Sequence, residues 1–182
     1  MSNHSTLFNN LMRFVGSSGI RFHDLRVQTT FGWALVGLIL SQTTHLSLWA
    51  LHRPGVSQAA SKERQLSRWL HNERIVPAVV YGPLLASVLA EWAGETLYLA
   101  LDTSQLWQRL VIVRLALVYR GRALPLGWVV RASGSATVAV ACYQRMLAEV
   151  AERIPHSSRV VLLADRGFMD VKLMQLARQL NW

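Results

Sequence analysis

Residues 97–102 read Leu-Tyr-Leu-Ala-Leu-Asp, and residues 160–165 read Val-Val-Leu-Leu-Ala-Asp. Each stretch is a short apolar run that ends in an aspartate and does not alternate between apolar and polar side chains. Continuous apolar runs are typical of strands buried on both faces, as in the centre of a parallel sheet. The two stretches therefore predict two buried strands, each ending at a carboxylate.

Between these stretches the sequence predicts a β-hairpin and a helix. Residues 110–119 and 123–130 are apolar and β-rich, with a turn between them. Pro125 cannot donate a ladder hydrogen bond, so the second arm should lie at a sheet edge. Helical spacing over residues 135–152 and 169–180 predicts two helices around the last strand. The order strand, strand, strand, helix, strand, helix favours a mixed sheet that combines a hairpin with a parallel crossover.

The N-terminal part of the chain has helical patterns and is rich in Trp. Residues 31–49 and 61–70 read as two helices, separated by the turn signal Arg-Pro-Gly at residues 53–55. A third helical stretch runs from about Pro83 to Trp92. The composition changes to strand patterning near residue 94.

Composition and charge exclude several classes of protein. The chain has 182 residues, 19 Lys and Arg against 10 Asp and Glu, a net charge of +9, and 52% hydrophobic residues. This apolar content supports a packed core and excludes global disorder. The single cysteine, Cys142, excludes an internal disulfide and a Cys-based zinc site and fits a reducing, cytosolic setting. The positive charge favours a polyanionic partner, either nucleic acid or an anionic membrane surface.

An uncharged segment over residues 27–51 raises the question of a transmembrane helix. Its purely apolar part covers only residues 31–40, and the polar residues 41–45 would then lie in the middle of the span without partners. We therefore favour a buried helix of a helical domain and expect no membrane association.

Three cations of the helix predicted over residues 61–70 can lie off its apolar face. They are Lys62, Arg64 and Arg68. A helix-turn-helix arrangement in a basic chain is one way to bind DNA. A solvated basic face is the alternative interpretation, and the spacing alone does not choose between them.

The two aspartates, Asp102 and Asp165, should stand side by side at one edge of the sheet. Parallel neighbours are roughly 4.8 Å apart, and the carboxyl edge is where open α/β sheets bind ligands. Two ionised carboxylates repel each other, and Mg²⁺ relieves that repulsion. Two such ions can activate a water or hydroxyl and stabilise the leaving oxygen of a phosphodiester. The residues therefore predict metal-assisted phosphodiester chemistry.

Each aspartate also has a purely structural interpretation. Asp102 could bond to a turn at Thr103 and Ser104, and either side chain there could bond a metal-bound water or the backbone. Asp165 could cap the helix after Gly167.

Three C-terminal motifs together resemble DDE transposases of the IS-four insertion-sequence family. Residues 99–104 (LALDTS) look like the first-aspartate motif of that family, residues 119–128 (YRGRALPLGW) like its shared hairpin, and residues 163–168 (LADRGF) like its second-aspartate motif. Residues 41–47 and 64–70 also look like its DNA-binding region. The resemblance covers nearly the whole chain.

The resemblance implies an α+β protein in two parts. Residues 1–93 would form a helical DNA-binding region, and residues 94–182 an incomplete ribonuclease-H-like α/β catalytic domain with a mixed sheet. Asp102 and Asp165 match the first two acidic ligands of Mg²⁺ or Mn²⁺ in that domain.

The third acidic ligand of the family is a Glu in the pattern Tyr-x2-Arg-x3-Glu-x6-Lys, downstream of the second aspartate. The candidates here, Glu149 and Glu152, precede Asp165 and are in the wrong order. We therefore expect the chain to correspond to the N-terminal part of a transposase and to be inactive alone.

The resemblance also implies partners. These are double-stranded DNA at transposon ends, in the bacterial cytoplasm and nucleoid, with a homodimer in a synaptic complex as one assembly. Arg120, Arg122 and Arg166 join the candidate DNA-binding residues. Two other interpretations remain: an inactive DNA-binding fragment that could inhibit the intact transposase, and a chain without function.

Overall fold

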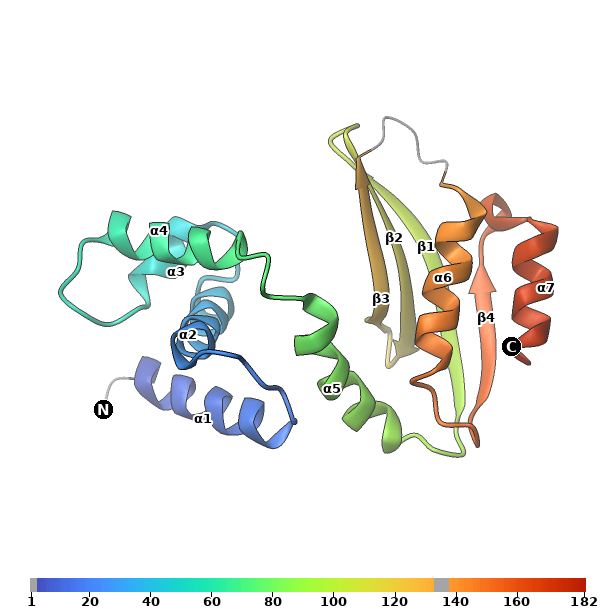
Figure 1. Ribbon diagram of the computed structural model, residues 1–182, viewed down its shortest axis with the longest axis horizontal. Helices are drawn as coiled ribbons and strands as arrows, with labels where there is room; N and C mark the ends of the chain where they lie inside the picture. The colour runs from blue at the N-terminus through green and yellow to red at the C-terminus, as the bar shows by residue number, and fades with distance from the viewer. Residues whose placement is uncertain (1–2, 133–137) are drawn as a thin grey trace. The chain divides into compact units, whose positions relative to one another are not determined.

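The computed structural model describes residues 3–132 and 138–182 (Figure 1). The chain divides into two compact units, Met1–Leu84 and Leu85–Trp182. They are called the helical unit and the sheet unit below, and each is described by itself. The division falls within a helix, whereas the change to strand patterning near residue 94 coincides with the start of the first strand.

The helical unit contains four helices and the first part of a fifth. They are α1 (Asn3–Ser17), α2 (Leu25–Ser41), α3 (Leu46–Leu51), α4 (Ala59–Leu70) and α5 (Pro77–Ala90). Its core is built from Ala34, Trp49, Ala50 and Leu66, all of them buried. The predicted helix over residues 61–70 is confirmed as α4.

The prediction of one helix over residues 31–49 is wrong. The helix ends at Ser41, because Gln42 adopts a left-handed conformation with a φ of 52°. A separate short helix, α3, follows, and the indole Nε1 of Trp49 donates to the carbonyl of Thr43 at 2.6 Å. The polar residues that interrupt the apolar run therefore form a turn, and the indole holds that turn against α3.

Two further helices differ from the prediction. α5 begins at Pro77 and contains Pro83, which was expected to mark its start. α1 was not predicted from the mixed polar and apolar N-terminus. It is held to α2 by Phe8, whose ring stacks on that of Trp33 with centroids 4.4 Å apart. No helix within residues 3–132 and 138–182 is long and apolar enough to cross a membrane.

The sheet unit holds a mixed four-stranded sheet in the order β3-β2-β1-β4 (Figure 1). Its elements are β1 (Thr96–Leu106), β2 (Leu110–Tyr119), β3 (Arg122–Ala132), α6 (Val140–Ala151), β4 (Arg159–Ala164), the 3-10 turn η1 (Arg166–Phe168) and α7 (Val171–Gln179). β1 and β2 are antiparallel, as are β2 and β3, whereas β1 and β4 are parallel.

This topology confirms the predicted order of elements and the α+β class. The hairpin of β2 and β3 forms as expected, and Pro125 lies in the edge strand β3, opposite Ala116 at a register shift. The first part of the predicted helix over residues 135–152 lies outside the described residues as far as residue 137, and α6 occupies the rest.

The first strand is longer than predicted. β1 continues past Asp102 to Leu106, because its last residues pair with β2 as far as Leu110. The connecting turn contains Trp107 and Gln108, both left-handed with φ of 51° and 55°. Asp102 therefore lies inside β1 and does not end it.

One face of the sheet packs against α6. Leu101 is paired with Leu115, and Leu115 with Gly127. A Cβ placed on Gly127 would approach Val150 and Met146 of α6 to 3.0 and 3.2 Å. Figure 1 shows α6 crossing this face of the sheet. The face is therefore closely packed against α6.

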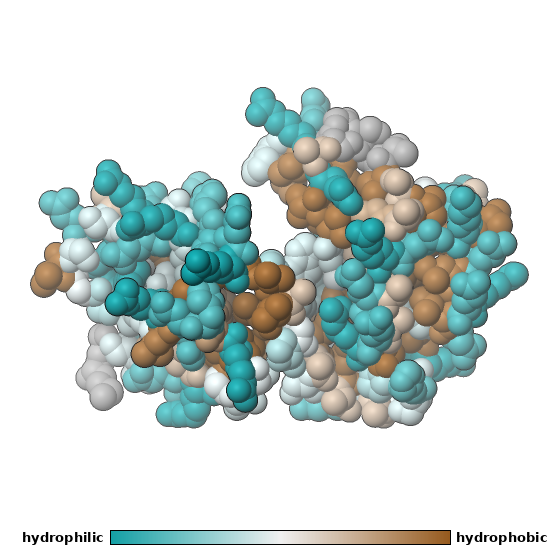
Figure 2. All heavy atoms as spheres, in the orientation of Figure 1, coloured by the Kyte–Doolittle hydropathy of each residue, from teal (hydrophilic) through white to brown (hydrophobic). Residues whose placement is uncertain are grey.

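The opposite face, called the outer face below, is not fully buried. Tyr98 in β1 is 49% exposed and Leu163 in β4 is 44% exposed, whereas Leu97, Leu99 and Leu101 are buried. Figure 2, drawn in the orientation of Figure 1, shows the sheet unit from the side of α6, where hydrophobic side chains also appear as brown atoms at the surface. The expectation that these strands are buried on both faces is therefore wrong, because large apolar side chains of β1 and β4 remain about half exposed on the outer face.

We expect Gly37→Ala to destabilise the helical unit. The new Cβ would lie 2.6 Å from the Cβ of Trp49 and 2.8 Å from its Cα, so α2 and α3 would have to separate. Overpacking of this kind costs about 1–3 kcal/mol of unfolding free energy, which urea titration monitored by circular dichroism would measure. Gly16→Ala is the matched control, because no atom lies within 4 Å of its new Cβ. Equal effects of the two substitutions would contradict the predicted close approach.

Candidate active site and nucleic-acid interface

The two predicted metal ligands lie beside each other in the sheet unit. Leu101 is paired with Ala164 across the parallel strands, so the next residues, Asp102 and Asp165, are neighbours. Adjacent strands lie about 4.8 Å apart. Because side chains alternate along a strand, Asp102 projects to the outer face, away from Leu101.

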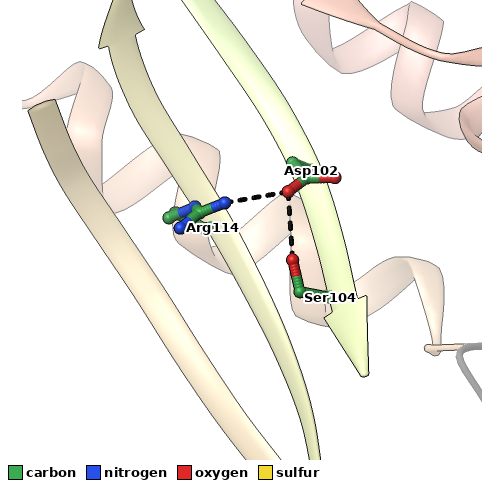
Figure 3. A network of polar contacts seen from close by, with 3 residues as sticks. All are labelled: Asp102, Ser104 and Arg114. Atoms are coloured by element: carbon green, nitrogen blue, oxygen red, sulfur yellow. Dashed lines mark hydrogen bonds and ion pairs between the residues drawn. The ribbon is translucent and has the colours of Figure 1, made fainter. Parts of the chain in front are cut away.

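Asp102 is held by two donors on that face. Nη2 of Arg114 in β2 lies 2.9 Å from Oδ2 of Asp102, and the hydroxyl of Ser104 donates to the same oxygen at 3.2 Å (Figure 3). The side chains of Arg114 and Asp102 are 44% and 50% exposed. An ion pair this exposed is worth about 0.2–1 kcal/mol, so it can be broken at little cost.

Asp165 caps the 3-10 turn that follows β4. Its Oδ1 accepts a hydrogen bond from the backbone N–H of Gly167 at 2.8 Å. The turn is held against α6 by Phe168, whose ring meets that of Tyr143 edge to face at 5.3 Å. Asp165 is therefore a capping residue, but of this turn and not of the helix after Gly167, because Asp170 caps α7 through the N–H groups of Lys172 and Leu173. The cap fixes the direction of the Asp165 carboxylate. Arg166 is exposed in this turn, next to the aspartates.

The two residues after Asp102 have different environments. Ser104 bonds to the carboxylate of Asp102 and not to a turn, because β1 continues through this position. The hydroxyl of Thr103 is buried without a hydrogen-bond partner. Thr103 is paired with Val113 on the α6 side of the sheet, so it cannot serve a metal ion held by Asp102.

The donor set at this position fits a hard divalent cation in part. Carboxylate oxygens are preferred ligands of Mg²⁺, which proteins hold through one or two carboxylates together with waters and phosphates. Within residues 3–132 and 138–182, no three His, Cys, Asp or Glu side chains cluster closely enough to hold a metal ion. Asp102 and Asp165 would therefore supply two of the ligands and leave the others to water or a phosphate.

The predicted basic face of α4 is only partly free. Arg64 and Arg68 are exposed, and Nε of Arg68 donates to the carbonyl of Arg64 at 3.4 Å. Lys62 instead lies along the turn before α4, where its Nζ donates to the carbonyl of Arg53 at 2.7 Å. Burial lowers the pKa of the Arg53 guanidinium. Arg64 and Arg68 are therefore the residues of α4 best placed to meet a polyanion.

Trp69 does not lie on that basic face. Its Nε1 donates to the carbonyl of Val27 at 3.0 Å, and its ring lies 5.8 Å from that of Phe31. Both rings line an apolar cavity of about 330 Å³ within the helical unit. Trp69 is therefore a packing residue, and stacking on DNA would require it to leave this position.

Arg120 and Arg122 lie far from the two aspartates. Both are exposed at the turn between β2 and β3, where the guanidinium of Arg120 stands 5.1 Å from the ring centroid of Tyr119. That turn is at the end of the sheet opposite the carboxyl end of β4, because β1 and β2 are antiparallel. Of the predicted DNA-binding cations in the sheet unit, Arg166 directly follows Asp165, whereas Arg120 and Arg122 lie at the other end of the sheet.

Sequence reasoning missed Arg114, which the structure places against Asp102. The available signal was a single cation in the otherwise apolar run Leu110–Tyr119. A charge inside a strand either breaks it or projects from a solvated face, and here it pairs with a carboxylate on the neighbouring strand. Its partner could not be read from the sequence without the register of β1 and β2.

Comparison with protein-family models, curated proteins and solved structures finds no match for this chain.

We expect the pair of Asp102 and Arg114 to contribute little to folding. A double-mutant cycle of Asp102→Ala and Arg114→Ala, measured by urea unfolding, should give a coupling of about 0.2–1 kcal/mol that decreases at high salt. The same cycle with Arg109→Ala, in the β1–β2 turn, should give no coupling. A coupling of several kcal/mol would contradict the solvated geometry of the pair.

Proposed function

We propose that this chain takes part in DNA transposition, as a fragment of a DDE transposase of the family that its motifs resemble. In the complete enzyme, Asp102 and Asp165 ligate Mg²⁺ or Mn²⁺ for phosphodiester hydrolysis and strand transfer at transposon ends. The observation that carries the proposal is the pairing of Leu101 with Ala164, which aligns the two aspartates on neighbouring strands.

The topology of the sheet unit supports this proposal. A hairpin, a helix and a strand parallel to β1 follow one another in the order expected for the first part of a ribonuclease-H-like domain. The aspartates also stand at the carboxyl end of β4, where α/β sheets bind ligands. Both features therefore support a site at the same edge of the sheet.

Different residues of the chain would have different roles at this site. Asp102 and Asp165 hold the cation, the backbone N–H of Gly167 orients the Asp165 carboxylate, and Arg166 meets a phosphate. A bound divalent cation supplies Lewis-acid activation of an attacking water or hydroxyl and stabilises the leaving oxygen. The partner is double-stranded DNA at transposon ends in the bacterial nucleoid, with a homodimer as the synaptic assembly.

The metal ligands can be tested by Mn²⁺ binding to the 182-residue chain, followed by electron paramagnetic resonance. Asp102→Asn and Asp165→Asn should each weaken binding by about tenfold or more. Asp170→Asn is the matched control, because Asp170 caps α7 through the N–H groups of Lys172 and Leu173, and Asn caps helices equally well. Binding that ignores both site variants would overturn the proposal. The chain alone should show no strand transfer, because the described residues place no third carboxylate at the site.

A second candidate function is a metal-independent DNA-binding module. It is favoured by the exposure of Arg64 and Arg68 on α4, together with the incomplete metal ligand set. A module of this kind would occupy transposon ends and inhibit the intact enzyme.

For this second function we expect duplex DNA binding without Mg²⁺ to depend on α4. The double variant Arg64→Ala and Arg68→Ala should reduce the slope of log affinity against log salt by about 2, as measured by fluorescence anisotropy. Asp165→Ala should bind as the wild type does. Arg13→Ala with Arg26→Ala removes the same charge from exposed positions of α1 and α2 and is the control. Equal losses in both double variants would exclude a specific role of α4.

A further inference from the structure

Three side chains form a line across the outer face of the sheet. Asp102 in β1 is paired with Arg114 in β2, and Arg114 with Trp128 in β3. Paired residues on neighbouring strands project to the same face. On the other side of Asp102, Asp165 directly follows Ala164, the residue of β4 that is paired with Leu101. A metal-ligating pair is thus continued by a cation and an aromatic ring.

The cation in this line blocks part of the metal site. Arg114 contacts Oδ2 of Asp102 at 2.9 Å, and Ser104 donates to the same oxygen (Figure 3). Each carboxylate oxygen has two lone-pair sites, so an oxygen that accepts from both a guanidinium and a hydroxyl has none left for a hard cation. Arg114 and a divalent cation therefore compete for Oδ2 of Asp102.

The competition is weak enough to be reversed. Both members of the ion pair are about half exposed, at 44% and 50%, so solvent already screens their attraction. Exposed pairs of this kind shift an equilibrium by about two- to fivefold. A divalent cation or an anion that offers Arg114 a better partner can therefore break the contact.

A DNA phosphate is such a partner. A guanidinium binds phosphate oxygens through two parallel hydrogen bonds, a geometry that the point charge of an ammonium group does not offer. Arg114 lies one strand from Asp102, so a phosphate near the two aspartates is within reach of its side chain. A phosphate bound there would attract the guanidinium of Arg114 away from Asp102 and so free Oδ2 for the cation.

We propose that Arg114 is an exchangeable latch on Asp102. Without DNA it occupies the carboxylate and weakens cation binding; when duplex DNA docks on the outer face it moves to a phosphate and frees Asp102. DNA and the cation then bind cooperatively. Arg114 is a positioning residue, and this inference rests on the proposed metal site of Asp102 and Asp165.

The test measures Mn²⁺ affinity of the full chain with and without a short mixed-sequence DNA duplex. In the wild type, the duplex should raise Mn²⁺ affinity by about two- to fivefold, because this is the factor by which the contact of Arg114 with Asp102 lowers that affinity. Arg114→Gln should bind Mn²⁺ about two- to fivefold more tightly without DNA and gain nothing from the duplex. Arg114→Lys keeps the charge but not the fork and should restore part of the coupling. Arg109→Gln, which removes a charge from the neighbouring turn, should behave as the wild type does.

Each negative result would contradict one particular claim. Wild-type Mn²⁺ affinity and wild-type coupling in Arg114→Gln would overturn the latch, while the metal site stands if Asp102→Asn still weakens binding. A merely structural role of Arg114 would lower the melting temperature without changing the coupling, and that result also overturns the latch. Mn²⁺ binding that neither Asp102→Asn nor Asp165→Asn reduces would overturn the metal site itself. If Arg114→Gln fails to fold, the wild type and Arg114→Lys still decide the question, because the wild type must show the coupling and Arg114→Lys must reduce it.

Discussion

The parallel pairing of β1 with β4 is the constraint on which the candidate site depends. Three of the four strands are joined by short turns, and only β4 arrives through a helix. In the register of these two strands, Leu101 lies opposite Ala164. That register brings the next residues, Asp102 and Asp165, side by side. A shift by one residue would move every side chain of β4 to the other face and separate Asp165 from Asp102. Leu97 and Val160, both buried and paired with each other, hold the register in place.

The unequal faces of the sheet follow from the same pairing. Leu99 and Leu101 are buried on the face of the sheet that packs against α6, so the alternate positions of these strands project to the outer face. A carboxylate and a guanidinium are tolerated at those positions because they remain half exposed. On the α6 side the same ion pair would pay a desolvation cost of several kcal/mol per ion. The ion pair of Asp102 and Arg114 therefore stands on the outer face of the sheet.

The sequence predicts the elements of this fold better than the contacts between them. The β2–β3 hairpin and the edge position of Pro125 follow from local patterns, and the adjacency of Asp102 and Asp165 follows from two apolar runs that end alike. The end of β1 could not be predicted, because residues 103–105 are polar and the turn at Trp107 and Gln108 lacks the glycine or asparagine of common hairpins. The break at Gln42 was hidden for a similar reason, since neither Gly nor Pro marks it.

The position of Arg114 likewise follows from the unpredicted length of β1. It explains why the sequence suggests a simpler site than the structure contains. A run that ends in aspartate suggests a free carboxylate, but the extended β1 sets Asp102 beside a cation twelve positions further along the chain. A cation at that distance is invisible to motif spacing and fixed only by the register of β1 and β2. Duplex DNA is a stiff, highly charged rod that needs an accessible face. Since the α6 side is closed by packing, a polyanion that met Asp102 would also meet Arg114, which contacts the same carboxylate at 2.9 Å.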